Sequence, residues 1–194
     1  SRSICWSCIM ATNVENYLHS LGKYIVKQSR TMLTKAKKNV TKDLYNSIKY
    51  EVVPNADGFS LQFYMLDYGK FVDKGVSGKK KIQEYKAWDK RKVASPFQFG
   101  TGSSLVGKAK GGMSGIMSKW VKKKGFQWKD KQTGKFMSHK SMGYLIARSI
   151  YRDGIKSLSF FQRPLGLGLD KFPTDLLGAV KKDIIDTLNK TTVN

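Results

Sequence analysis

The clearest candidate for nucleotide chemistry is one near-match to a phosphate-binding loop. Residues 102–109 read Gly-Ser-Ser-Leu-Val-Gly-Lys-Ala, which fits such a loop at every position except the last. That position should be Ser or Thr, because its hydroxyl holds Mg²⁺, and Ala109 has no hydroxyl. The loop should also follow a buried strand and open a helix, and neither pattern is present here. We interpret the segment as part of a mobile, glycine-rich loop over residues 100–115.

The sulfur and imidazole groups are too few to indicate a metal or redox centre. Cys5 and Cys8 are the two cysteines and are spaced C-x-x-C. A zinc site takes four N or S ligands, and His19 and His139 lie outside finger spacing. A redox C-x-x-C would lie beside a βαβ pattern, which does not follow. We interpret the cysteines as a thiol pair in an N-terminal arm, and neither histidine as catalytic.

Carboxylate chemistry is indicated only weakly. Glu84-x-Lys86 has the Glu-x-Lys form of metal-dependent nucleases, which need a second acid on a neighbouring strand to hold the metal. Asp67 and Asp73 are the nearest upstream acids, and no strand pattern flanks Glu84. Only 14 of 194 residues are Asp or Glu, so paired-carboxylate catalysis is not expected. The sequence predicts no catalytic residue, no metal site and no cofactor.

The charge is the abnormal property of this chain. Its formal net charge is +22, which implies a polyanionic neighbour such as nucleic acid, an acidic protein surface or an anionic membrane. Residues 74–140 hold 18 Lys and Arg against 3 Asp and Glu, a net +15 that leaves +7 for the rest. Trp120 and Trp128 lie near one basic run, which fits either a nucleic-acid grip or a solvated face over a buried Trp. The candidate partner contacts are Lys79, Lys80, Lys81, Lys122, Lys123 and Lys124.

The elements around residues 39–75 predict a β-hairpin. A β-rich segment over residues 47–53 is followed by a reversal over residues 54–58, which contains Pro and Asp-Gly. The returning segment alternates, which is the clearest strand signal in the chain. The apolar face of that strand consists of Phe59, Leu61, Phe63 and Met65.

Apolar residues recur at helical spacing both before and after the hairpin. A first helix is expected from Thr12 to about Lys38, with a capping box formed by Thr12 and Glu15. Further helices are expected over residues 113–125 and 142–154, and a last one beginning near Pro173. The apolar stripe of the first helix contains Val14, Tyr17, Leu18, Leu21, Ile25 and Met32. That of the last helix contains Leu176, Leu177, Val180, Ile184 and Leu188.

These elements predict an α+β protein. Long N-terminal and C-terminal helices should cover a small antiparallel sheet, and a long basic, Gly/Lys-rich insertion should occupy residues 76–140. We expect an N-terminal arm over residues 1–11 and one α+β domain over residues 12–194. No apolar run approaches the ~20 residues that cross a bilayer, and no signal peptide is recognisable.

Three short motifs resemble the tail-completion or neck proteins of tailed bacteriophages. A Thr-x-x-Leu-x-x-Ser-Ile turn follows the first helix, and the hairpin ends in Tyr-Gly-x-Phe-Val-x-x-Gly. Near the C-terminus, Phe-Phe-x-Arg-Pro-Leu is similar to a Pro-containing segment of that family. The usual Thr-Gly pair of the family is Thr-Lys here, and the insertion is not covered by the resemblance. The residues that carry it are Thr41, Leu44, Ile48, Tyr68, Phe71, Gly75, Phe160, Phe161 and Pro164.

The resemblance implies a structural virion protein and not an enzyme. Such subunits form a homo-oligomeric ring around the DNA exit channel, between the portal or connector and the tail proteins. The expected location is the neck of the virion, after assembly in the host cytoplasm, with DNA nearby and no membrane. The alternative hypotheses are a basic DNA-binding protein acting alone and a metal-dependent nuclease.

Overall fold

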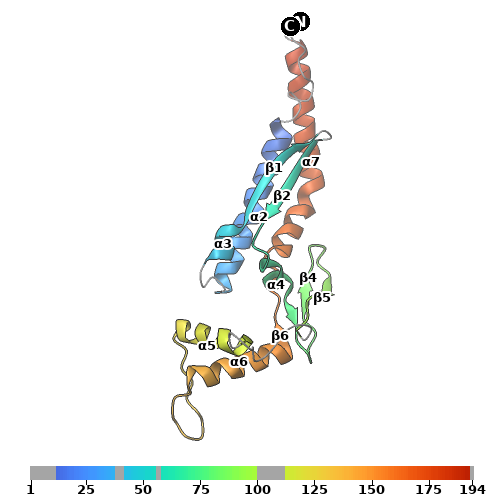
Figure 1. Ribbon diagram of the computed structural model, residues 1–194. Helices are drawn as coiled ribbons and strands as arrows, with labels where there is room; N and C mark the ends of the chain where they lie inside the picture. The colour runs from blue at the N-terminus through green and yellow to red at the C-terminus, as the bar shows by residue number, and fades with distance from the viewer. Residues whose placement is uncertain (1–11, 38–41, 56–57, 100–111, 193–194) are drawn as a thin grey trace. The chain divides into compact units, whose positions relative to one another are not determined.

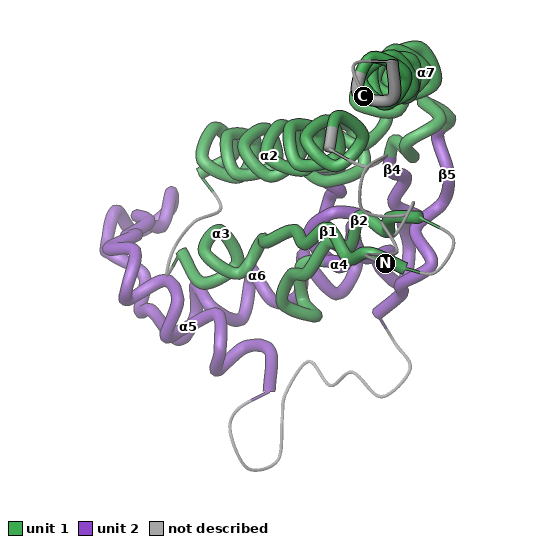
Figure 2. Tube along the Cα trace, turned by 90° about the horizontal axis from the view of Figure 1, so that it is seen from above, with its two compact units in different colours: residues 1–69, 86–91, 159–194 green, residues 70–85, 92–158 purple. Residues whose placement is uncertain are grey.

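The computed structural model describes residues 12–37, 42–55, 58–99 and 112–192. Their contacts divide the chain into two compact units, which Figure 2 colours separately. Unit 1 contains residues 1–69, 86–91 and 159–194, and unit 2 contains residues 70–85 and 92–158. Unit 2 overlaps the expected insertion but begins earlier and extends to residue 158.

Unit 1 is built from two long helices and a β-ribbon. Helix α2 contacts the ribbon and also the C-terminal helix α7, so α2 lies at the centre of this unit (Figure 1). The α+β class and the long terminal helices expected from the sequence are confirmed. The elements are α2 (Thr12–Lys35), α3 (Asp43–Ser47), β1 (Lys49–Asn55), β2 (Gly58–Tyr64) and α7 (Gln162–Thr192).

Unit 2 combines a helix pair with short strands. Strand β3 pairs with β6 in an antiparallel sheet, and helix α5 packs along α6. Gly143 of α6 allows this close approach, because a Cβ there would lie 2.5 Å from the Ser118 backbone nitrogen of α5. The elements are α4 (Gly69–Lys74, of which Gly69 belongs to unit 1), β3 (Val76–Ser77), β4 (Glu84–Lys86, of which Lys86 belongs to unit 1), β5 (Lys92–Ala94), α5 (Gly112–Lys124), α6 (His139–Asp153) and β6 (Gly154–Ile155).

The hairpin is confirmed, with a shift in its bounds. Strands β1 and β2 pair antiparallel from Lys49 opposite Tyr64 to Asn55 opposite Gly58. The first strand begins two residues later than expected because α3 extends to Ser47. It also continues through Pro54, which a ribbon accepts because an edge strand leaves one side of its backbone unpaired.

Helix α2 buries a stripe that covers about the predicted length of the helix but includes residues that the sequence pattern did not assign to it. Leu18, Leu21 and Ile25 are buried as expected, but the stripe continues through Val26, Ser29 and Leu33. Met32, which the sequence placed on this stripe, is only half-buried. The helix ends at Lys35, three residues before the expected end.

The start of the last helix was predicted wrongly. Helix α7 begins at Gln162, eleven residues before Pro173, which lies inside the helix. Two glycines in this first part of α7 are needed for packing. A Cβ on Gly166 would lie 2.1 Å from the Trp88 carbonyl oxygen, and one on Gly168 would lie 2.8 Å from the Leu21 side chain.

A glycine follows each helix of unit 2, as the expected helix ends at residues 125 and 154 indicated. Gly75, Gly125 and Gly154 follow α4, α5 and α6 with φ angles of 73°, 67° and 82°. Glycine adopts these positive angles without the steric cost that a Cβ imposes. In the turn over residues 129–134, the Asp130 carboxylate accepts hydrogen bonds from the backbone N–H groups of Gln132 and Thr133. These two hydrogen bonds hold the pKa of Asp130 below its ordinary value.

Candidate binding surfaces

The residues that carry the family resemblance divide into buried and exposed sets. Leu44 and Ile48 are buried in unit 1 beside α2, and Phe160 and Pro164 are buried at the start of α7. Phe161 packs edge-on against Phe63 of β2, with ring centroids 5.3 Å apart. These positions stabilise unit 1. Thr41 lies outside the described residues.

The second motif has a different role at each position. Tyr68 is 44% exposed and Phe71 is 39% exposed, so neither belongs to a core. Phe71 packs edge-on against Phe97 at 4.6 Å between ring centroids. Gly75 is required sterically, since a Cβ there would lie 2.7 Å from the Ile155 carbonyl oxygen.

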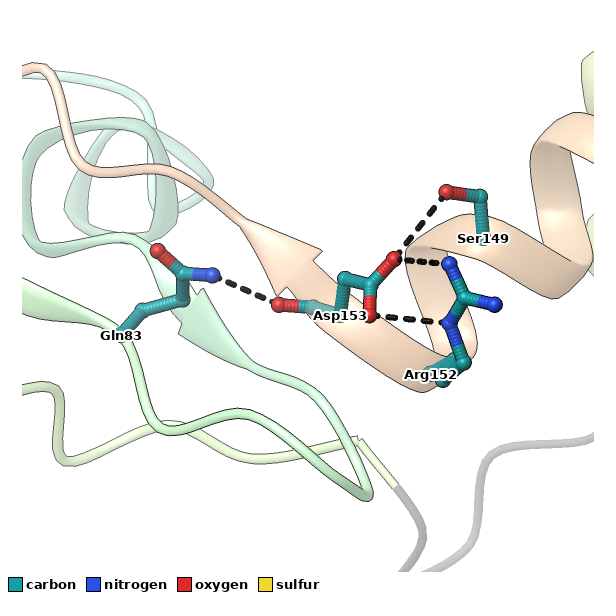
Figure 3. A network of polar contacts seen from close by, with 4 residues as sticks. All are labelled: Gln83, Ser149, Arg152 and Asp153. Atoms are coloured by element: carbon teal, nitrogen blue, oxygen red, sulfur yellow. Dashed lines mark hydrogen bonds and ion pairs between the residues drawn. The ribbon is translucent and has the colours of Figure 1, made fainter.

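The first lysine run lies on an anchored loop of unit 2. The backbone N–H groups of Lys79 and Lys80 donate to the carbonyls of Tyr151 and Arg152, both at 2.9 Å. Gln83 is buried and donates through its amide to the Asp153 carbonyl at 2.6 Å (Figure 3). The loop therefore presents its exposed lysines from a fixed backbone.

Figure 3 also shows the ion pair that closes α6. The Arg152 guanidinium donates to both carboxylate oxygens of Asp153, at 2.9 and 2.7 Å, and the Ser149 hydroxyl lies 3.4 Å from one of them. Hydrogen bonding to Arg152 holds the pKa of Asp153 below its ordinary value. The Asp153 carboxylate already accepts hydrogen bonds from Arg152 and Ser149, so its position gives no indication of a bound ligand.

The second lysine run lies at the end of α5. Lys122, Lys123 and Lys124 are exposed in its last turn, where cations interact favourably with the helix dipole. Trp120 is half-buried against Phe126, with ring centroids 5.4 Å apart, whereas Trp128 is 45% exposed. Neither tryptophan is fully buried, so both the nucleic-acid and the solvated-face interpretations of this lysine run stay predictions.

Helix α7 carries an apolar stripe that unit 1 leaves uncovered. The sequence predicted the apolar stripe of this helix from Leu176, Leu177, Val180, Ile184 and Leu188, of which Leu176 is half-buried. In the structure Ala179 and Asp183 are buried, and the larger apolar side chains beside them are exposed by 38–62%. The residues of this α7 stripe are Leu177, Val180, Ile184, Ile185 and Leu188.

A buried carboxylate of α7 caps the first turn of α2. Asp183 is only 4% exposed and accepts hydrogen bonds from the backbone N–H groups of Asn13 and Val14, at 3.0 and 3.1 Å. It also accepts from the Asn13 side chain at 2.8 Å. The expected capping box involves Thr12, whose side chain lies outside the described residues. The acceptor seen here comes from 170 residues away, which no local pattern reveals.

A groove of about 960 Å³ runs between α2 and the segment containing α3 and the start of β1. Several basic residues of α2 line this groove. None of the described residues lining it is Asp or Glu. Its basic residues are Lys23, Lys27, Arg30, Lys35 and Lys49, and its apolar and aromatic residues are Val26, Tyr45, Ile48 and Tyr50. We call it the basic groove.

Of the candidate catalytic and metal positions, Glu84, His19 and His139 lie within the described residues. Contrary to the sequence interpretation, Glu84 lies on a short strand, β4. The described residues contain no group of three or more His, Cys, Asp or Glu side chains that could hold a metal ion. His19 packs against Tyr50 in unit 1, with ring centroids 5.8 Å apart. The Cys5/Cys8 pair and residues 102–109 lie outside the described residues.

Comparisons with family models, with curated proteins and with solved structures found no match to this chain. Within the described ranges, none of the helices has the length and apolar character needed to span a bilayer. The chemistry of the surfaces themselves therefore supports the functional proposal.

Proposed function

We propose that this protein is a structural subunit of the tailed-phage neck. Copies would form a ring around the DNA exit channel, between the portal or connector and the tail proteins. The short motifs described above suggest this role, and the α7 stripe is the observation that carries it.

The α7 stripe supports self-assembly because water contacts large apolar side chains along several turns of one helix. Leu177 is 62% exposed, Ile184 45% and Leu188 58%, and these positions follow one another at helical spacing. A monomer gains nothing from such a surface, whereas a neighbouring subunit can bury it at about 25 cal/mol for each Å².

The β-ribbon offers a second surface for assembly. In the part of the chain that the structure describes, β1 pairs only with β2, so each strand keeps one edge with unpaired backbone groups. A neighbouring copy can extend such an edge through main-chain hydrogen bonds. A repeated contact of this kind closes into a ring when the rotation between copies permits.

Assembly is tested by measuring the mass of the native protein, alone and mixed with portal and tail proteins. We expect a closed oligomer of the 21.9 kDa chain, either alone or when the portal protein is present. Negative-stain images should then show rings. A protein that stays monomeric under both conditions, and that is absent from assembled particles, would contradict the proposal.

A substitution within the α7 stripe tests the interface itself. Ile184→Glu places a charge in the centre of the stripe and should leave the chain monomeric, because burying an unpaired carboxylate is strongly unfavourable. Lys182→Glu is the matched control, since it changes the charge of an exposed position on the same helix outside the stripe. Equal loss of assembly in both variants would indicate a general charge effect and not this interface.

A further inference from the structure

We propose that the basic groove binds a single strand of nucleic acid. The ligand would lie along α2, with its phosphates on the lysines and its bases toward the tyrosine rings. The inference goes beyond ring assembly and does not depend on it, because one copy of unit 1 supplies every residue that lines the groove.

The cations of α2 form a row suited to a strand of phosphates. Lys23, Lys27 and Arg30 follow the i, i+4, i+7 spacing, which places them on one face of the helix over about 10 Å of rise. Lys49 supplies a further cation from the opposite wall, at the start of β1. A polyanion with closely spaced charges matches this row better than one carboxylate or one free phosphate does.

Arg30 fixes the shape of the groove. Its guanidinium donates to the carbonyls of Tyr45 and Ile48, at 3.1 and 2.9 Å, and lies 5.2 Å from the centre of the Tyr45 ring. It therefore ties both walls together, which leaves the flexible lysines to contact the ligand. Arg30 is a positioning residue in this proposal.

The tyrosines distinguish a single strand from a duplex. Tyr45 and Tyr50 line the groove, and aromatic side chains can stack on bases that are not paired. Gly22 allows the Tyr50 ring to lie directly against α2, because a Cβ on Gly22 would lie 2.4 Å from that ring. A duplex keeps its bases stacked inside and would use only the lysines.

A second copy of this chain is a poor occupant for the groove. The protein has 36 Lys and Arg against 14 Asp and Glu, so copies repel one another electrostatically at such a surface. The groove thus requires an anionic partner of another kind, and repeated phosphates supply the charge density that it matches.

The test measures binding of a fluorescent oligothymidine of about 15 nucleotides, between about 50 and 200 mM salt. The groove variant combines Lys23→Ala, Lys27→Ala and Lys49→Ala. The control combines Lys79→Ala, Lys80→Ala and Lys81→Ala, which removes the same charge from the loop of unit 2. All six lysines are exposed, so both variants should fold, which circular dichroism will check.

We expect the groove variant to bind the oligonucleotide at least about tenfold more weakly, and the control less than about threefold. The slope of log K against log salt should fall by about 2 in the groove variant, since each lost phosphate contact contributes about 0.7. Equal weakening in both variants would overturn the proposal in favour of a diffuse positive field. No weakening in the groove variant would overturn it as well.

Two competitors test the class of ligand. Polyglutamate that displaces the oligonucleotide at equal charge concentration would contradict a nucleic-acid site and favour an acidic polypeptide. A duplex that binds more tightly than the single strand would contradict the role of the tyrosines. A protein that binds oligothymidine through the groove, but stays monomeric with and without the portal protein and is absent from assembled particles, would support this inference and contradict ring assembly.

Discussion

Replacing Asp183 with Ala tests whether α7 stabilises the N-terminus of α2. The substitution removes the acceptor for two backbone N–H groups and for the side chain of Asn13. Loss of a helix cap costs about 0.5–2 kcal/mol, and the lost charge near the helix dipole adds about 0.3–1 kcal/mol. We expect unit 1 to lose about 2 kcal/mol of unfolding free energy, because the carboxylate is buried and its donors lose their partner together.

Urea unfolding measures the loss of overall stability, and amide hydrogen exchange shows which helix turns lose protection. With a slope of about 1–3 kcal/mol per M, the unfolding midpoint of Asp183→Ala should fall by about 1 M. Exchange should accelerate in the first turn of α2, while α5 and α6 in unit 2 keep their protection.

Two further variants control for this interpretation. Asp186→Ala removes an exposed carboxylate that accepts a hydrogen bond from the Asn13 side chain but caps neither backbone N–H group. It should therefore lower the free energy of unfolding by less than about 0.5 kcal/mol. Asp183→Asn keeps an acceptor oxygen but loses the charge, and should fall between the two. If Asp183→Ala is no more destabilising than Asp186→Ala, the capping argument is wrong.

Three other predictions use stability and titration measurements. In urea melts, Gly166→Ala should lower the free energy of unfolding by about 1–3 kcal/mol, because the added methyl would meet the Trp88 carbonyl. Gly178→Ala has open space around it and should be neutral or stabilise α7 by up to about 1 kcal/mol. Ser29→Ala should be neutral or stabilising by about 1 kcal/mol, since that buried hydroxyl has no hydrogen-bond partner within the described residues; a loss above 1 kcal/mol would contradict this. Burial, and secondarily a nearby carboxylate, raise the pKa of Tyr17, so its stabilising contribution is present below about pH 10 and is lost as the pH rises through the raised pKa. The difference in phenolate absorbance between the protein and Tyr17→Phe, followed against pH, reports the ionisation of Tyr17. We expect its midpoint at a higher pH than for an ordinary tyrosine, and a midpoint at the ordinary pKa would refute the prediction.

Local patterns in the sequence predicted elements whose limits depend on neighbouring residues. The alternation in β2 and the glycines after α4, α5 and α6 correspond to backbone preferences of single residues, and the structure agrees with them. Such signals need no knowledge of tertiary contacts.

The errors arose where distant segments meet. The sequence placed the start of the last helix near Pro173, but α7 begins at Gln162. Gly166 and Gly168 allow the Trp88 backbone and Leu21 to approach this first part of the helix. The cap from Asp183 could not be foreseen, since donor and acceptor are separated by 170 positions. For the same reason the sequence could not show that the lysines of α2 face a tyrosine-lined groove.

The α7 stripe illustrates another limit. An amphipathic pattern indicates which face of a helix avoids water, but it does not identify the partner that covers it. Ala179 and Asp183 face the rest of unit 1, while Ile184 and Leu188 remain in water. Only the structure showed which face of α7 packs against the rest of unit 1.

The most direct test of the proposed role is photo-crosslinking from the α7 stripe in assembled protein. A photoreactive amino acid at position 188 should form covalent links to another copy of the chain, and the same probe at position 182 should form few. We expect dimers and higher multiples of the chain on a denaturing gel for the probe at position 188. Purely monomeric product from position 188, in a sample shown to be folded, would contradict assembly through α7.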